Sequence, residues 1–165
     1  MKTIMALLLA ILVMGGSSRE EGPVVRSADL MILTGARWSG SLTYLDYRSN
    51  RKVTIPSTLQ VGRDPKDQNS FIFDYQYPDE PQAASREVVV IGSSGGTLTG
   101  ERVVARRDQA GGLVLVTEKA GMDNQRPALI RHTYQISPAS FSIRKEVRYG
   151  AEEEFLQRNE YRWQR

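Results

Sequence analysis

The chain has 165 residues, a formal net charge of +3 and no cysteine. This length suits a single domain with its own core, and the lack of cysteine excludes disulfides, thiolate metal sites, iron–sulfur clusters and covalently attached haem. Basic and acidic residues are interspersed along the chain, and no clustered basic stripe is visible, so no nucleic-acid partner is expected.

Residues 1–18 have the pattern of a secretory signal peptide. Lys2 precedes an apolar run from Ile4 to Met14, and Gly15-Gly16-Ser17-Ser18 supplies small residues for cleavage. The run is too short to span a membrane. Without a cysteine there is no lipid anchor, so the sequence predicts a secreted or periplasmic protein that is not a lipoprotein. Residues 19–26 are expected to form a flexible arm.

A short helix is expected next. Ser27 can cap a helix over Ala28–Leu33, which Gly35 would end. Its apolar residues Leu30, Ile32 and Leu33 would close one end of the structure that follows.

Alternating apolar residues then predict the first strands. We expect Trp38–Tyr47 to turn at Ser49-Asn50, so that Trp38 faces Val61 and Tyr44 faces Ile55. Residues 71–77 form a strand with one wholly aromatic face. The loop 78–85 that follows is either a lid or a solvated crossover.

The middle of the chain predicts a short strand over 87–91 and a hairpin. The hairpin joins Thr97–Arg106 to Leu113–Lys119, with Val104 opposite Val116, Arg102 opposite Glu118 and Glu101 opposite Lys119. The pattern does not decide which face of this hairpin is internal.

Three closing strands, within 128–163, have the clearest alternation. The turn at Ser137–Ser140 pairs Ile136 with Phe141, Tyr134 with Ile143, His132 with Lys145 and Arg131 with Glu146. The next turn is expected to pair Ile143 with Tyr161, Arg144 with Glu160, Glu146 with Arg158 and Tyr149 with Phe155.

Many short strands joined by short turns indicate an all-β fold. We predict that residues 27–165 form a single antiparallel up-and-down β-barrel of 8–10 strands with a short N-terminal helix.

Two sequence segments resemble the calycin superfamily, the lipocalin-like β-barrels. They are Gly35-Ala36-Arg37-Trp38 at the first strand and Tyr161-Arg162-Trp163-Gln164-Arg165 in the last. In lipocalins an arginine of the last strand packs over the first-strand tryptophan, which implies a barrel-closing role for Trp38 with Arg162 or Arg165. The glycine–tryptophan spacing here is one residue longer than in that family. The resemblance, which extends more loosely to secreted bacterial lipocalin-like domains, implies a small apolar ligand in a barrel cavity.

Polar residues on the inward face of the closing strands are the strongest site candidates. His132, Lys145 and Asn159 share this face, and Lys145 requires a partner, Asp46 being one choice, or water at a wet mouth. His132 either joins a hydrogen-bond network with Lys145 or Tyr44, or serves as an axial haem ligand as in related barrels.

We therefore expect a barrel that binds a small, largely apolar or amphipathic ligand with an anionic or carbonyl end. The polar end would be held by His132, Lys145 and Asn159, and the apolar part by Tyr44, Phe73, Tyr75 and Tyr161. The alternatives are a solid barrel acting as a structural or protein-interaction module of the envelope, and haem binding through His132. No nucleophile–base pair with recognisable spacing is present, so we expect neither an enzyme nor a cofactor.

Overall fold

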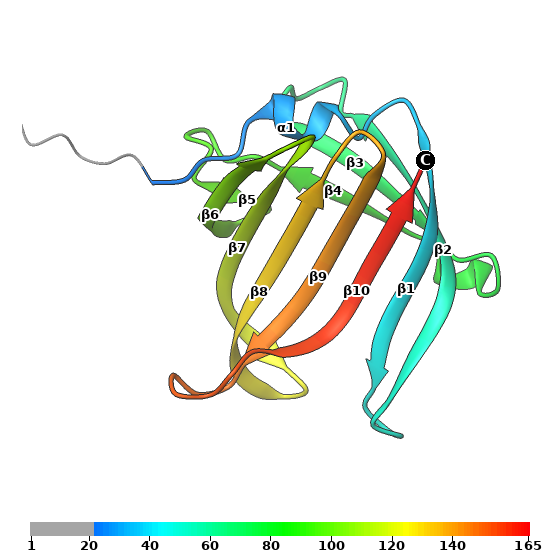
Figure 1. Cartoon of the computed structure of the whole chain (residues 1–165), viewed down its shortest axis with the longest axis vertical. Coiled ribbons are helices and arrows are strands. Elements are labelled where there is room, and N and C mark those ends of the chain that lie inside the picture. Colours follow the sequence, from blue (N-terminus) through cyan, green and yellow to red (C-terminus); the bar gives the residue numbers. More distant parts are fainter. Residues whose placement is uncertain (1–21) are drawn as a thin grey trace, which may run out of the picture.

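The computed structural model describes residues 22–165, which form one ten-stranded sheet (Figure 1). The elements are α1 (Ser27–Met31), β1 (Arg37–Asp46), β2 (Arg51–Arg63), β3 (Ser70–Gln76), the 3-10 helix η1 (Pro81–Ala83), β4 (Ser85–Val90), β5 (Thr97–Leu98), β6 (Glu101–Gln109), β7 (Gly112–Asp123), β8 (Arg126–Ile136), β9 (Ser140–Arg148) and β10 (Leu156–Gln164). The predicted signal peptide lies outside the described residues.

The sheet curves into a nearly closed up-and-down barrel, which confirms the predicted fold class. Its strand order is β4-β3-β2-β1-β10-β9-β8-β7-β6-β5, and every pairing is antiparallel. The two ends of this order meet where Ile91 bridges Leu98 and the Thr99 amide donates to the Val90 carbonyl at 2.6 Å. The topology is compatible with the lipocalin-like fold that the sequence resembles.

The predicted register of β8 with β9 is confirmed. Ile136 faces Phe141, Tyr134 faces Ile143, and His132 faces Lys145. The short turn between the strands is held by the Ser137 amide, which donates to the Ser140 carbonyl at 2.9 Å.

The register of β9 with β10 is confirmed in one half and wrong in the other. Ile143 faces Tyr161 and Arg144 faces Glu160 as expected, but a β-bulge between Gln157 and Asn159 shifts the rest. Glu146 consequently faces Gln157, not Arg158.

The same bulge displaces the predicted pairing of Tyr149 with Phe155, because Val147 now faces Leu156. A bulge places an extra residue in one strand and re-aims its side chain. Here the extra residue is Arg158, which turns toward the barrel interior.

The register predicted for the first hairpin is off by two residues. Trp38 faces Leu59 instead of Val61, and Tyr44 faces Val53 instead of Ile55. An error of two residues leaves every side chain on its predicted face, so Leu42 and Tyr44 still point inward.

The middle hairpin contains two irregularities that the pattern does not reveal. The predicted strand over 97–106 is interrupted at Thr99 and Gly100, which have φ angles of 50° and 76° and form a tight turn. Arg102 faces Glu118 as predicted, but a second bulge places Ala105, not Val104, opposite Val116.

One end of the barrel is closed by α1 and is tightly packed. Leu30 and Leu33 of the helix segment are buried, and the Trp38 indole donates to the Leu33 carbonyl at 2.8 Å. Arg165 lies over the Trp38 ring, 5.0 Å from its centre, whereas Arg162 pairs with Glu160 at 2.9 Å. Of the two arginines considered for this contact, the structure places Arg165 there.

The helix begins one residue earlier and ends two residues earlier than predicted, at Ser27 and Met31. The Arg26 amide donates to Asp29 at 2.8 Å in the manner of a capping box, while the Ser27 hydroxyl donates to the Gln68 carbonyl at 3.1 Å. Residues 22–26 of the segment predicted to be an arm lie against this end, where Val25 is buried and its amide donates to the Gly95 carbonyl at 2.9 Å.

Candidate functional site

Five inward-facing side chains form a row across five adjacent strands. Lys145 on β9 faces His132 on β8 and Asn159 on β10. Asn159 in turn faces Tyr44 on β1, and His132 faces Thr117 on β7. The shared inward parity of His132, Lys145 and Asn159 was predicted from the strand period, and the register brings the three side by side.

The histidine of this row is held by a buried carboxylate. The Nδ1 atom of His132 lies 2.8 Å from Oε2 of Glu101, which also accepts a hydrogen bond from the Thr117 hydroxyl at 2.6 Å. Lys119 lies 2.9 Å from the other oxygen, Oε1. The partner of His132 is therefore Glu101, and not Lys145 or Tyr44.

These partners keep Glu101 ionised. Burial by itself would raise the pKa of Glu101, but hydrogen bonds from His132, Thr117 and Lys119 lower it to about 2. A carboxylate can only accept, so the hydrogen bond assigns a proton to Nδ1 of His132.

Beside this network lies a partly open space of about 200 Å³, which we call the inner cavity. Its lining includes four aromatic rings, those of Phe73, Tyr75, Tyr134 and Tyr161. Its polar lining includes Glu87, Thr99, Glu101, Lys119, His132 and Asn159. Five of the seven predicted ligand-binding residues thus line one cavity: Phe73, Tyr75, His132, Asn159 and Tyr161.

The tyrosines of the inner cavity are neutral hydroxyl groups. Burial raises the pKa of Tyr75, Tyr134 and Tyr161, and the Tyr77 hydroxyl, 2.6 Å away, raises that of Tyr161 further. The Tyr75 hydroxyl donates to Glu87 at 3.3 Å. These rings offer apolar faces and hydrogen bonds but no negative charge.

The other two predicted ligand-binding residues, Lys145 and Tyr44, line a separate and more open space. This mouth groove has a volume of about 480 Å³ and lies at the barrel end opposite α1. Its lining is Leu42, Tyr44, Leu45, Asp46, Tyr47, Arg48, Lys145, Arg158 and Asn159. Asn159 lines both spaces and marks the boundary between them.

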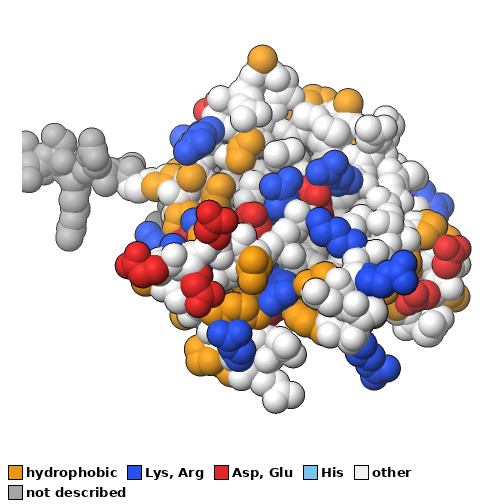
Figure 2. Space-filling view, turned by 60° about the horizontal axis from the view of Figure 1, so that its bottom comes forward, with side chains coloured by type: hydrophobic (Ala, Val, Ile, Leu, Met, Phe, Trp, Pro, Cys, Tyr) orange, Lys and Arg blue, Asp and Glu red, His pale blue; other side chains and the backbone are white. Residues whose placement is uncertain are grey.

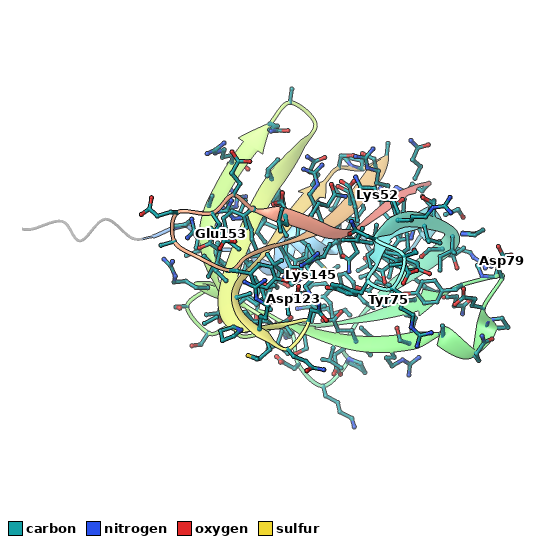
Figure 3. All side chains as sticks on the ribbon, turned by 90° about the horizontal axis from the view of Figure 1, so that it is seen from below. Lys52, Tyr75, Asp79, Asp123, Lys145 and Glu153 are labelled. Atoms are coloured by element: carbon teal, nitrogen blue, oxygen red, sulfur yellow. The ribbon has the colours of Figure 1, made fainter. Side chains whose placement is uncertain are left out.

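A buried aspartate at the end of β7 organises the mouth. Asp123 accepts hydrogen bonds from the hydroxyls of Tyr47 at 2.9 Å and Tyr149 at 2.7 Å, and from Nε of Arg158 at 2.9 Å. The ammonium of Lys145 lies 3.6 Å from it. Figure 3 looks into the barrel from this end and shows Lys145 and Asp123 close together inside the ring of strands.

These contacts keep the carboxylate of Asp123 ionised. Burial would raise the pKa of Asp123, but hydrogen bonds from Tyr149 and Tyr47 and the charges of Arg158 and Lys145 lower it. Lys145 is thus paired with Asp123 and not with Asp46, whose carboxylate instead accepts from the Ser49 hydroxyl in its own turn.

Sequence reasoning missed three residues of the candidate site. Arg158 was predicted to pair with Glu146, and only the bulge turns it inward. Glu101 was predicted to pair with Lys119 in a hairpin whose internal face the pattern does not decide, and Asp123 falls between the predicted strands over 113–119 and 128–163. A lone aspartate in a loop has no sequence signal that separates it from a turn residue.

Viewed from this end, the surface carries basic side chains across its middle and acidic side chains toward its sides (Figure 2). Among residues 22–165 no group of three His, Asp or Glu side chains could hold a metal ion. Haem binding through His132 finds no support in the geometry, because the space that His132 lines is about 200 Å³, below the 300–1,000 Å³ of typical ligand pockets. No helix within the described residues is long and apolar enough to cross a membrane.

A scan against protein-family models and a search of curated proteins find no match for the chain.

Proposed function

We propose that the protein is a secreted or periplasmic barrel that binds a small, largely apolar ligand with an anionic or carbonyl end, without catalysing a reaction. One observation carries the proposal: the mouth groove contains two cations, Lys145 and Arg158, that share a single buried carboxylate, Asp123. The signal-peptide pattern of residues 1–18 supports the location, and the lipocalin resemblance supports the ligand class.

At Asp123, two positive charges, those of Lys145 and Arg158, meet one negative charge. Arg158 takes one oxygen of Asp123 at 2.9 Å, whereas Lys145 lies at 3.6 Å from the other, beyond the usual hydrogen-bond distance. The Lys145 ammonium is therefore drawn toward Asp123 but keeps its donors available. An anionic or carbonyl group placed between Lys145 and Arg158 would receive charge-assisted hydrogen bonds.

The apolar part of such a ligand has a matching surface. Leu42 and Tyr44 face inward from β1 and are only half-buried, so they present apolar area to the groove. Beyond them Asn159 leads toward the inner cavity. Covering this surface would stabilise the complex by about 25 cal/mol for each Å² of apolar area removed from water.

The test compares decanoate with decanol, which has the same chain and no charge. Lys145→Met keeps the stem of the side chain but removes its charge, so decanoate should bind about tenfold to a hundredfold more weakly, and decanol about equally. Isothermal titration calorimetry is the suitable measurement, since Trp38 and Trp163 are both buried in the packed end and would report the mouth poorly.

Lys52→Met is the matched control. Lys52 is exposed on β2, so this substitution removes the same charge at a position outside the groove. It should leave decanoate binding unchanged. Equal losses of decanoate affinity in the two variants, or no binding of decanoate by the parent protein, would contradict an anion site in the mouth groove.

A second candidate, a structural or protein-interaction module, is favoured by one observation. The inner cavity of about 200 Å³ is smaller than the 300–1,000 Å³ of typical ligand pockets, and the aromatic side chains Trp38, Phe141 and Trp163 at the end near α1 are buried. Absence of binding for both decanoate and decanol would make this module the better account of the protein.

A further inference from the structure

The inner cavity contains a polar atom that the fold leaves available. Within residues 22–165 the imidazole of His132 has one hydrogen-bond partner, Glu101, through Nδ1. No side-chain polar atom of these residues is both buried and without a partner. The other ring nitrogen, Nε2, is therefore accessible, and His132 is part of the lining of the inner cavity.

The chemistry of Nε2 follows from its neighbours. Glu101 is a carboxylate that accepts the proton of Nδ1, and Lys119 at 2.9 Å already balances its charge. A neutral imidazole protonated at Nδ1 has a lone pair at Nε2. This lone pair accepts a hydrogen bond from a ligand hydroxyl group.

The size and walls of the cavity restrict the ligand further. An apolar cavity of about 150 Å³ engineered in another protein binds benzene, so about 200 Å³ is enough for one six-membered ring with a small substituent. Tyr75 and Tyr161 pack against each other, with ring centres 5.4 Å apart, and both line the cavity as aromatic walls. The carboxylates of Glu87 and Glu101 line the same space and would repel an anion.

We propose that the inner cavity is a second binding site, distinct from the mouth groove, for a neutral single-ring compound that carries a hydroxyl group. The ring lies among Phe73, Tyr75 and Tyr161, and its hydroxyl donates to Nε2 of His132. This site does not depend on the anion site at Lys145 and Arg158.

The test uses 4-fluorophenol and 4-fluorotoluene, observed by fluorine NMR during titration with the protein. The parent protein should bind 4-fluorophenol at least tenfold more tightly than 4-fluorotoluene, because only the first can donate to His132. His132→Phe keeps a ring but removes the acceptor, so it should cancel this preference. A preference that survives in His132→Phe, or no binding of 4-fluorophenol by the parent, would overturn the proposal.

A second variant guards against loss of structure, because His132→Phe takes a partner from Glu101. Ile143→Phe adds volume to the cavity wall without touching the polar network and should weaken both compounds about equally. Near-ultraviolet circular dichroism checks that each variant is folded. Unchanged binding of both compounds in folded Ile143→Phe would place them outside the cavity and refute the site.

Charged analogues separate this site from the mouth groove. We expect 4-fluorobenzoate to bind the parent more weakly than 4-fluorophenol, because Glu87 and Glu101 line the cavity, and tighter binding of 4-fluorobenzoate would contradict the site. Decanoate titrated into His132→Phe should bind as in the parent, since His132 does not line the mouth groove. Failure of decanoate binding with intact 4-fluorophenol binding would refute the proposed function alone, and the reverse result would refute the inner site alone.

Discussion

The two ends of the barrel are built from the same strands but differ in their inward-facing side chains, which are aromatic at one end and polar at the other. Near α1, β9 and β10 contribute Phe141 and Trp163, each about 1% exposed and stacked with ring centres 5.4 Å apart. Two turns of the alternation further along, toward the mouth, the same strands contribute Lys145 and Asn159.

This difference separates stability from binding. Apolar rings that exclude water fill the closed end and hold the sheet in its curvature. Toward the mouth, the inward side chains are polar and partly exposed, and they hydrogen-bond to two acidic residues, Glu101 in the inner cavity and Asp123 at the mouth. A protein can keep a hollow, polar end when the opposite end supplies most of the buried apolar area.

The largest loss of stability is expected from substitution of Trp163 at the closed end. Its ring stacks on Phe141 and Tyr161, and its indole donates to the Ser57 hydroxyl at 3.2 Å. Trp163→Ala should lower the free energy of unfolding by about 3–5 kcal/mol. Urea unfolding is the measurement, and Met122→Ala, at an exposed position near the mouth, is the control, expected within about 0.5 kcal/mol of the parent. A loss below 1 kcal/mol in Trp163→Ala would contradict the assignment of stability to the closed end.

The polar half should make stability depend on pH. The pKa of Glu101 falls from 4.5 to about 2 on folding, so the carboxylate stabilises the folded state fully above pH 4.5. As pH falls from about 4.5 to about 2, this contribution, about 3 kcal/mol, is lost.

Glu101→Gln should therefore be less stable than the parent at pH 7, and the difference should shrink toward pH 2. Urea unfolding at several pH values measures it. Glu152→Gln, an exposed glutamate in the β9–β10 loop, is the control and should follow the pH profile of the parent. A constant difference between Glu101→Gln and the parent across this range would show that the network does not act through ionisation.

The smallest effect is expected where the chain ends over the first strand. The Arg165 guanidinium lies 5.0 Å from the centre of the Trp38 ring and also donates to the Pro138 carbonyl. Arg165→Met should lower the free energy of unfolding by about 0.5–1 kcal/mol, the size of an exposed cation–π contact. Arg162→Met, which removes the neighbouring arginine that pairs with Glu160, tests the specificity of the contact by thermal unfolding. An equal or larger effect at Arg162 would assign the role to that residue.

The alternation of apolar and polar residues was sufficient to predict the barrel, the pairing of β8 with β9 and the inward parity of His132, Lys145 and Asn159. This information is local, because a strand repeats every two residues whatever it pairs with. Even the two-residue error in the first hairpin left Tyr44 on the correct face.

The tertiary structure alone decided what those inward residues meet. The bulges that reverse Arg158 and displace Val104 depend on how neighbouring strands twist as the sheet closes, and no single strand records that curvature. Asp123 and Arg158 are 35 residues apart in the chain and come together only because the barrel brings β7 and β10 to a common mouth. The sequence thus indicated which residues of the closing strands face inward, but closure of the sheet determined which residues they contact.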